Sequence, residues 1–145
     1  MAGGPAAALD ARAPLPLTAV MAEHQKRNMR EHLAAVQAIV AALAADDLAA
    51  AGTAARKIGY SDSMAQMCQH MGAGAAGFTE KALAFHRTAD TIATAAGKGD
   101  KPGVVRALGE TLQACVGCHA AYRQEVVDQA TWERRTSDVE HRPKE

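Results

Sequence analysis

The chain has 145 residues, enough for one domain with its own buried core. Hydrophobic residues make up 48% and charged residues 22%, which excludes a wholly disordered chain. Sixteen basic residues balance sixteen acidic ones, and this neutrality argues against nucleic acid or an anionic membrane as partner. No apolar run reaches the roughly 20 residues of a membrane span, and the N-terminus shows no basic region followed by an apolar one, so no secretory signal is predicted.

The residue types favour helices. Aromatic residues amount to only 3%, and alanine supplies much of the apolar content. Alanine loses no side-chain entropy in a helix, whereas strands are enriched in β-branched and aromatic residues. The odd number of cysteines, three, argues against a simple disulfide framework and favours cofactor or metal chemistry.

The first half of the chain predicts a lead-in and two helices. Residues 1–17 mix Gly, Pro and Ala without a period, which predicts a flexible lead. A helix is predicted over residues 19–45, with Thr18 as its N-cap, and an alanine-rich helix over residues 47–58. The inward seam of the first helix is predicted to hold Met29, Leu33, Val36, Val40 and Leu43.

The middle of the chain predicts a short helical piece ending near Met71, a loop over residues 72–77 and a helix over residues 78–96. The seam of that helix is predicted to hold Phe78, Ala82, Phe85, Ala89 and Ile92.

A connector is predicted over residues 97–103 and a fourth helix over residues 104–129. The inward stripe of this helix is predicted to hold Val105, Leu108, Leu112, Cys115, His119, Tyr122 and Val126. The charged tail after Trp132 is expected to be loose. The fold predicted is all-α, an antiparallel four-helix bundle of residues 18–130 between a lead (1–17) and a tail (131–145).

The strongest motif is Cys115-Val116-Gly117-Cys118-His119, a Cys-x-x-Cys-His sequence. Two thiols at this spacing reach the two vinyl groups of a porphyrin and form thioethers, and the histidine that follows can ligate the iron. A thioredoxin-like redox pair would need a βαβ context, and a structural zinc site would need a second ligand pair. The motif therefore predicts one covalently attached haem c, enclosed by the bundle.

The segment Cys115 to Arg123 (CVGCHAAYR) resembles the C-terminal block of class II c-type cytochromes, the family that includes cytochrome c-prime. The order and lengths of the predicted helices from residue 19 to residue 129 are also similar. The resemblance implies thioether bonds at Cys115 and Cys118, His119 as the proximal ligand and Arg123 close to the haem edge. It also implies a distal residue from the first helix.

The distal residue decides the function. A thioether ligand favours ferrous iron and suits electron transfer, whereas relatives with an apolar distal residue bind small gases. Met29 is the predicted ligand, although methionine is also a common core filler. Met21 and His32 are alternatives on the same helix.

A second group of soft side chains comprises Met64, Met67, Cys68, His70 and Met71. Such groups suit Cu(I). The favoured interpretation is that they are core and loop residues and that Cys68 is a buried free thiol. Alternatively, Cys68 could form a disulfide between two subunits. His24, His86 and His141 show no partner pattern and are expected to face solvent.

The predicted function is a monohaem electron carrier that exchanges single electrons with redox proteins and is not an enzyme. The alternatives are a five-coordinate haem protein that binds NO or CO, and a redox subunit of a larger enzyme. Haem attachment of this kind occurs outside the bacterial cytoplasm, which implies a periplasmic protein whose leader is missing from this chain. The resemblance also admits a homodimer through the first two helices.

Overall fold

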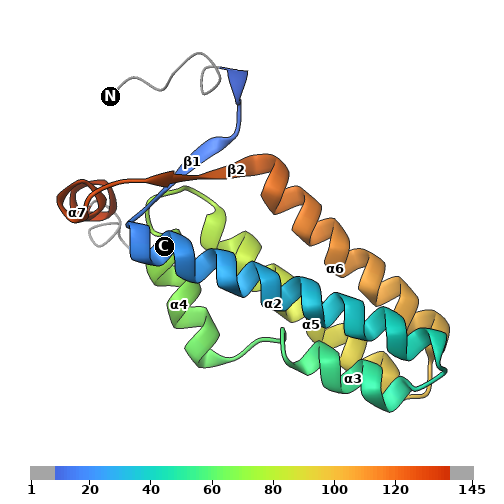
Figure 1. Ribbon diagram of the computed structural model, residues 1–145. Helices are drawn as coiled ribbons and strands as arrows, with labels where there is room; N and C mark the ends of the chain where they lie inside the picture. Colours follow the sequence, from blue (N-terminus) through green and yellow to red (C-terminus); the bar gives the residue numbers. More distant parts are fainter. Residues whose placement is uncertain (1–8, 138–145) are drawn as a thin grey trace, which may run out of the picture.

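The computed structural model describes residues 9–137, which form a mostly helical structure with one small two-stranded sheet (Figure 1). In chain order the elements are β1 (Ala13–Leu17), α2 (Ala19–Ala44), α3 (Leu48–Arg56), α4 (Asp62–Gly72), α5 (Phe78–Gly97), α6 (Lys101–Ala121), β2 (Tyr122–Val126) and α7 (Gln129–Ser137). Within residues 9–137, no helix combines the length and hydrophobicity needed to cross a membrane.

Polar caps fix where the helices begin. The side chain of Thr18 accepts a hydrogen bond from the backbone N–H of Met21, which confirms Thr18 as the N-cap of α2. Asp47 caps α3 and Ser61 caps α4 in the same manner. Asp100 caps α6, so this helix begins at Lys101 inside the predicted connector, with a proline in its first turn where the missing N–H does no harm.

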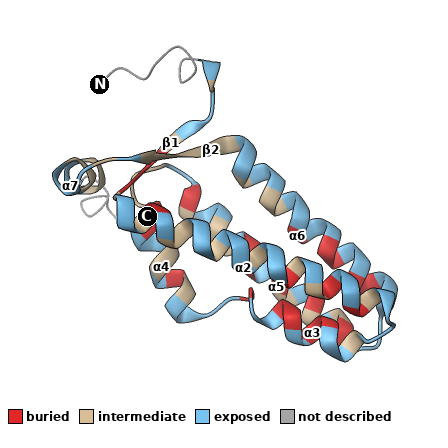
Figure 2. Ribbon diagram, viewed as in Figure 1, coloured by how far each residue is buried: buried red, intermediate tan, exposed pale blue. Residues whose placement is uncertain are grey.

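The main core lies where α2, α3, α5 and the first half of α6 meet (Figure 2). α5 packs along α6 and α3, and α2 packs along α3. The predicted seam of α5 is largely confirmed, because Phe78, Phe85, Ala89 and Ile92 are buried.

The face of α2 that packs in the core differs from the predicted inward seam. Met29, Leu33 and Val40 are exposed, whereas the buried residues of α2 are Ala22, Ala35, Ile39 and Ala42. Small side chains let α2 approach α3 closely, so the alanine-rich face is the packed one. The larger apolar side chains lie on an adjacent face.

The stripe predicted for α6 was also shifted. Val105 and Leu112 are exposed, whereas Val104, Ala107, Leu108 and Thr111 are buried. All the buried residues of α6 belong to its first half. The second half, which carries the Cys-x-x-Cys-His motif, presents no fully buried residue to the core.

The largest departure from the sequence prediction is the sheet. The fourth helix ends at Ala121, not near Gln129, and β2 follows it directly. β1 pairs with β2 in parallel, with Ala13 opposite Tyr122 and Leu17 opposite Val126. Residues 13–17 are therefore a strand and not a flexible lead. The sequence did not predict this strand because its partner is more than a hundred positions away and leaves no local signal.

The tail predicted to be loose contains most of α7. Its tryptophan, Trp132, contacts the ring of His70 on α4 with 5.0 Å between ring centroids, and Arg135 forms an ion pair with Glu125 at 3.1 Å. These contacts hold residues up to Ser137 in a helix. Residues 1–8 of the lead and 138–145 of the tail lie outside the described residues.

Candidate functional site

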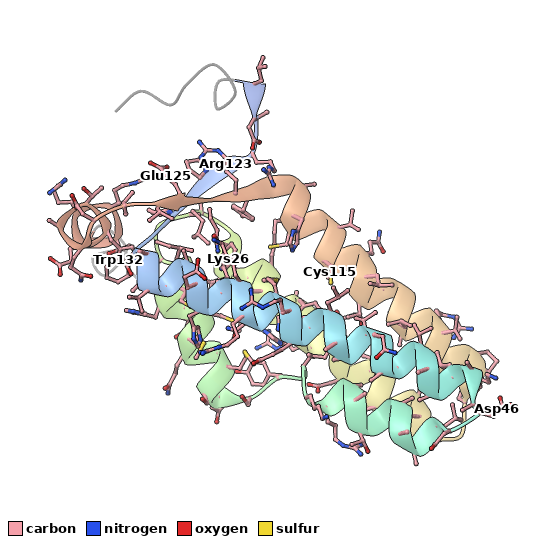
Figure 3. All side chains as sticks on the ribbon, viewed as in Figure 1. Lys26, Asp46, Cys115, Arg123, Glu125 and Trp132 are labelled. Carbon is pink, nitrogen blue, oxygen red and sulfur yellow. The ribbon has the colours of Figure 1, made fainter. Side chains whose placement is uncertain are left out.

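The Cys-x-x-Cys-His motif occupies the last two turns of α6. Cys118 and His119 are three and four positions after Cys115, a spacing that places all three side chains on neighbouring parts of one helix face. Both thiols are half-buried, and burial raises the pKa of each. Neither cysteine forms a disulfide. In Figure 3, Cys115 lies on the side of α6 that faces α2.

A cavity of about 340 Å³ lies beside the motif, between α2, α4, α5 and α6. Its lining residues are Gln25, Asn28, Met29, His32, Leu33, Val36, Met64, Met67, Cys68, Met71, Phe78, Lys81, Ala82, Phe85, His86, Leu112, Ala114, Cys115, Cys118 and His119. Most of these side chains are apolar, and a few polar groups stand among them, as is usual for cofactor sites.

The cavity wall fits a large flat apolar group. Three of its large apolar side chains are exposed, Met29 by 36%, Leu33 by 71% and Leu112 by 41%. Among the described elements, the backbones of α2 and α6 approach each other closely at few positions, and these three side chains all line the cavity. A porphyrin attached at Cys115 and Cys118 would cover such surface, and removing apolar area from water stabilises the bound form.

The three candidates for the distal position occupy different surroundings. Met29 lines the cavity, as does His32, whereas Met21 does not. Met21 packs instead with Leu15 and Leu17. The structure therefore brings Met29 and His32 to the same cavity as His119, and the assignment of Met29 to the iron stays a prediction.

The surroundings of His32 keep its imidazole neutral. Its ring contacts Phe85 with 4.8 Å between centroids and His86 with 5.5 Å. Burial, together with the neighbouring His86, lowers the pKa of His32 from 6.5 to about 4.

Arg123, implied by the resemblance to lie at the haem edge, is outside the residues that line the cavity. It belongs to β2, with Pro14 as its register partner (Figure 3). Among the described residues its Nε atom is buried without a hydrogen-bond partner. Its part in haem binding stays a prediction.

Four of the soft side chains, Met64, Met67, Cys68 and Met71, line the cavity from α4. They are therefore cavity-wall residues, and Cys68 is a half-buried free thiol. His70 instead turns to Trp132. In the part of the chain that the structure describes, no three His, Cys, Asp or Glu side chains gather closely enough to bind a metal ion.

Two histidines expected to face solvent have defined partners. His86 is only 3% exposed and donates from Nδ1 to the carbonyl oxygen of Ile58 at 2.7 Å. Arg27 donates to Nδ1 of His24 at 2.8 Å, which leaves the Nε2–H of His24 to donate to the sulfur of Met67 at 3.0 Å. Ile58 and Met67 lie far from these histidines in sequence, so no spacing rule indicates them, whereas Arg27 lies one helical turn after His24. His141 lies outside the described residues.

The geometry thus defines a helical protein with a Cys-x-x-Cys-His motif beside an apolar cavity. A family model described as Cytochrome C' matches residues 70–123, from the end of α4 through the motif to Arg123. No curated protein and no solved structure is similar enough to the chain to count as a match. The family match supports a class II c-type cytochrome, and this family implies a monohaem c-type protein with a haem cofactor.

Proposed function

We propose that the chain is an electron carrier with one haem c bound in the cavity between α2 and α6. The observation that carries the proposal is that Cys115, Cys118 and His119 from α6 line the same cavity as Met29 from α2. When bound, haem c supplies an iron that accepts one electron from a donor protein and passes it to an acceptor protein.

Each of these residues has a separate part in the proposal. The thiols of Cys115 and Cys118 would hold the porphyrin by thioether bonds, and His119 would ligate the iron from α6. Met29 would ligate the iron from α2, and its thioether would favour the ferrous state. Helices α2, α3, α5 and α6 would be the four helices of the predicted bundle.

The remaining side chains of the cavity exclude water from the site. Phe78 and Phe85 are both buried and line the cavity from α5. Low solvent access around a redox centre keeps the energetic cost of rearranging water during electron transfer small. No catalytic role is proposed, and the expected location is the periplasm, where this class of cytochrome generally resides.

The test is the ferric absorption spectrum of three variants, Met29→Ala, Met21→Ala and His32→Ala. A thioether ligand gives ferric haem a weak long-wavelength band. Met29→Ala is expected to abolish this band, whereas Met21→Ala serves as the matched control because Met21 lies outside the cavity lining. Persistence of the band in Met29→Ala, or its loss in Met21→Ala, would contradict the assignment. If only His32→Ala loses the low-spin ferric spectrum, His32 and not Met29 is the ligand.

A further inference from the structure

The N-terminal strand lies against the end of the helix that carries the motif. Pairing between β1 and β2 begins with Ala13 opposite Tyr122, the first residue after α6. The two strands run side by side at that end of the molecule (Figure 1). The chain just before β1 is thereby brought to the last turn of α6.

Arg12 makes direct contact with this last turn. Its Nη1 donates to the carbonyl oxygen of His119 at 3.3 Å and to that of Tyr122 at 3.5 Å. The carbonyl groups in the last turn of a helix have no partner within the helix, and a positive charge there is favoured by the helix dipole. Arg12 thus binds the backbone of the residue proposed to ligate the iron.

Asp10 fixes the orientation of this guanidinium. Its Oδ1 accepts from Nε of Arg12 at 3.0 Å and its Oδ2 from Nη2 at 2.7 Å, a two-point contact that sets the plane of the guanidinium. The backbone N–H of Arg12 donates to the same carboxylate. Because Asp10 engages Nε and Nη2, Nη1 remains for the end of α6.

The strand that follows Arg12, β1, is anchored in the cavity wall. Leu15 and Leu17 are fully buried in a cluster with Met71, Phe78 and Cys118. All three of these last residues also line the cavity. Gly74 lies directly against this strand, since any side chain there would collide with the ring of Pro16.

We infer that Arg12, oriented by Asp10, is a positioning residue for His119. By binding the carbonyl groups at the end of α6 from its place just before the anchored strand, Arg12 fixes the turn from which the imidazole would reach the iron. This inference rests on the proposed function, because His119 has a ligand role only with haem bound. A cation at this place also disfavours the extra positive charge of ferric iron, so Arg12 raises the reduction potential.

The test uses the haem-loaded full chain and the variants Arg12→Gln and Arg12→Lys. Arg106→Gln is the control, because Arg106 lies on the same helix about 20 Å before His119 along its axis. Two quantities are measured, the hydrogen exchange of the amides at the end of α6 and in β2, and the midpoint reduction potential.

Arg12→Gln is expected to speed exchange in that segment about tenfold, as for the loss of a charge-assisted hydrogen bond, and to lower the potential. Arg12→Lys keeps the charge, but its single ammonium group cannot hold both Asp10 and two carbonyl groups. Amide hydrogen exchange in Arg12→Lys is therefore expected to stay fast. Its reduction potential is expected to return most of the way to the native value. Arg106→Gln should change neither quantity.

Exchange in Arg12→Gln equal to that of the control would overturn the inference, since the guanidinium would not hold the helix end. A potential equal to that of the control would overturn it as well, since the contact would then be structural only. Absence of haem from the native chain would be a failure of the proposed function instead. It is recognised from the native absorption spectrum, before any variant is compared.

Discussion

The imidazole of His86 donates from Nδ1 to the carbonyl oxygen of Ile58 at 2.7 Å, linking α5 to the turn that follows α3. His86 is almost fully buried, and its ring contacts Phe85 and His32. Burial lowers the pKa of His86, against the opposing effects of the bond to Ile58 and the charge of Asp90. The native state therefore holds this imidazole neutral.

This arrangement predicts that acid destabilises the protein. A histidine in the unfolded chain takes up a proton near pH 6.5, whereas native His86 does so only at lower pH. Below pH 6.5 the unfolded chain binds more protons, so the free energy of unfolding falls as the pH falls. His86→Gln, which cannot be protonated in this range, is expected to flatten this dependence below pH 6.5.

Thermal unfolding at a series of pH values checks this prediction. In His86→Gln the slope of stability against pH should be reduced but not abolished, because His32, with a pKa of about 4, contributes in the same direction. Equal slopes for the native chain and His86→Gln would mean that His86 is not held neutral in the folded state.

Two neighbouring valines test which face of α6 is packed. Val104 is fully buried, whereas Val105 is 53% exposed. Val104→Ala is expected to lower the free energy of unfolding by about 2 kcal/mol, because it removes two methyl groups and leaves a cavity. Val105→Ala should change it by less than about 0.5 kcal/mol. Denaturant unfolding measures the free energy of unfolding of both variants. A larger loss in Val105→Ala than in Val104→Ala would support the stripe predicted from the sequence.

The three cysteines test where the haem is attached. The double variant Cys115→Ala/Cys118→Ala is expected to lose all haem on a denaturing gel, since both thioether bonds are removed. Cys68→Ala is the matched control, because Cys68 lines the same cavity but lies outside the motif. This control should retain its haem in full. Haem retained by the double variant would show that the motif is not the attachment site.

The sequence predicted best what depends on near neighbours along the chain. Thr18 caps α2 as expected, and the seam of α5 around Phe85 and Ile92 is buried as expected. Capping and helical periodicity act over three or four residues, so a single sequence carries their signal.

The largest departures depend on partners that are distant in sequence. β1 forms because Ala13–Leu17 pairs with a strand near the other end of the chain, and its two prolines argued for a loop. The periodicity of α2 placed Met29 and Leu33 inward, but alanines form the packed face because they allow a close approach to α3. The larger side chains of α2 are left for the cavity.

The candidate site was partly accessible from sequence. The motif at Cys115 to His119 indicated the chemistry directly, and Met29 does lie at the cavity beside it. The contributions of α4 and of His86 were not predicted, since Met67 and His86 follow no ligand spacing and reach the cavity only through the tertiary fold.

The most direct test of the account is the absorption spectrum of the dithionite-reduced holoprotein before and after addition of CO. An iron ligated by both His119 and Met29 has no open position, so we expect sharp α and β bands that CO leaves unchanged. A broad high-spin spectrum that shifts on addition of CO would contradict it. The cavity would then hold a five-coordinate haem that binds small gases.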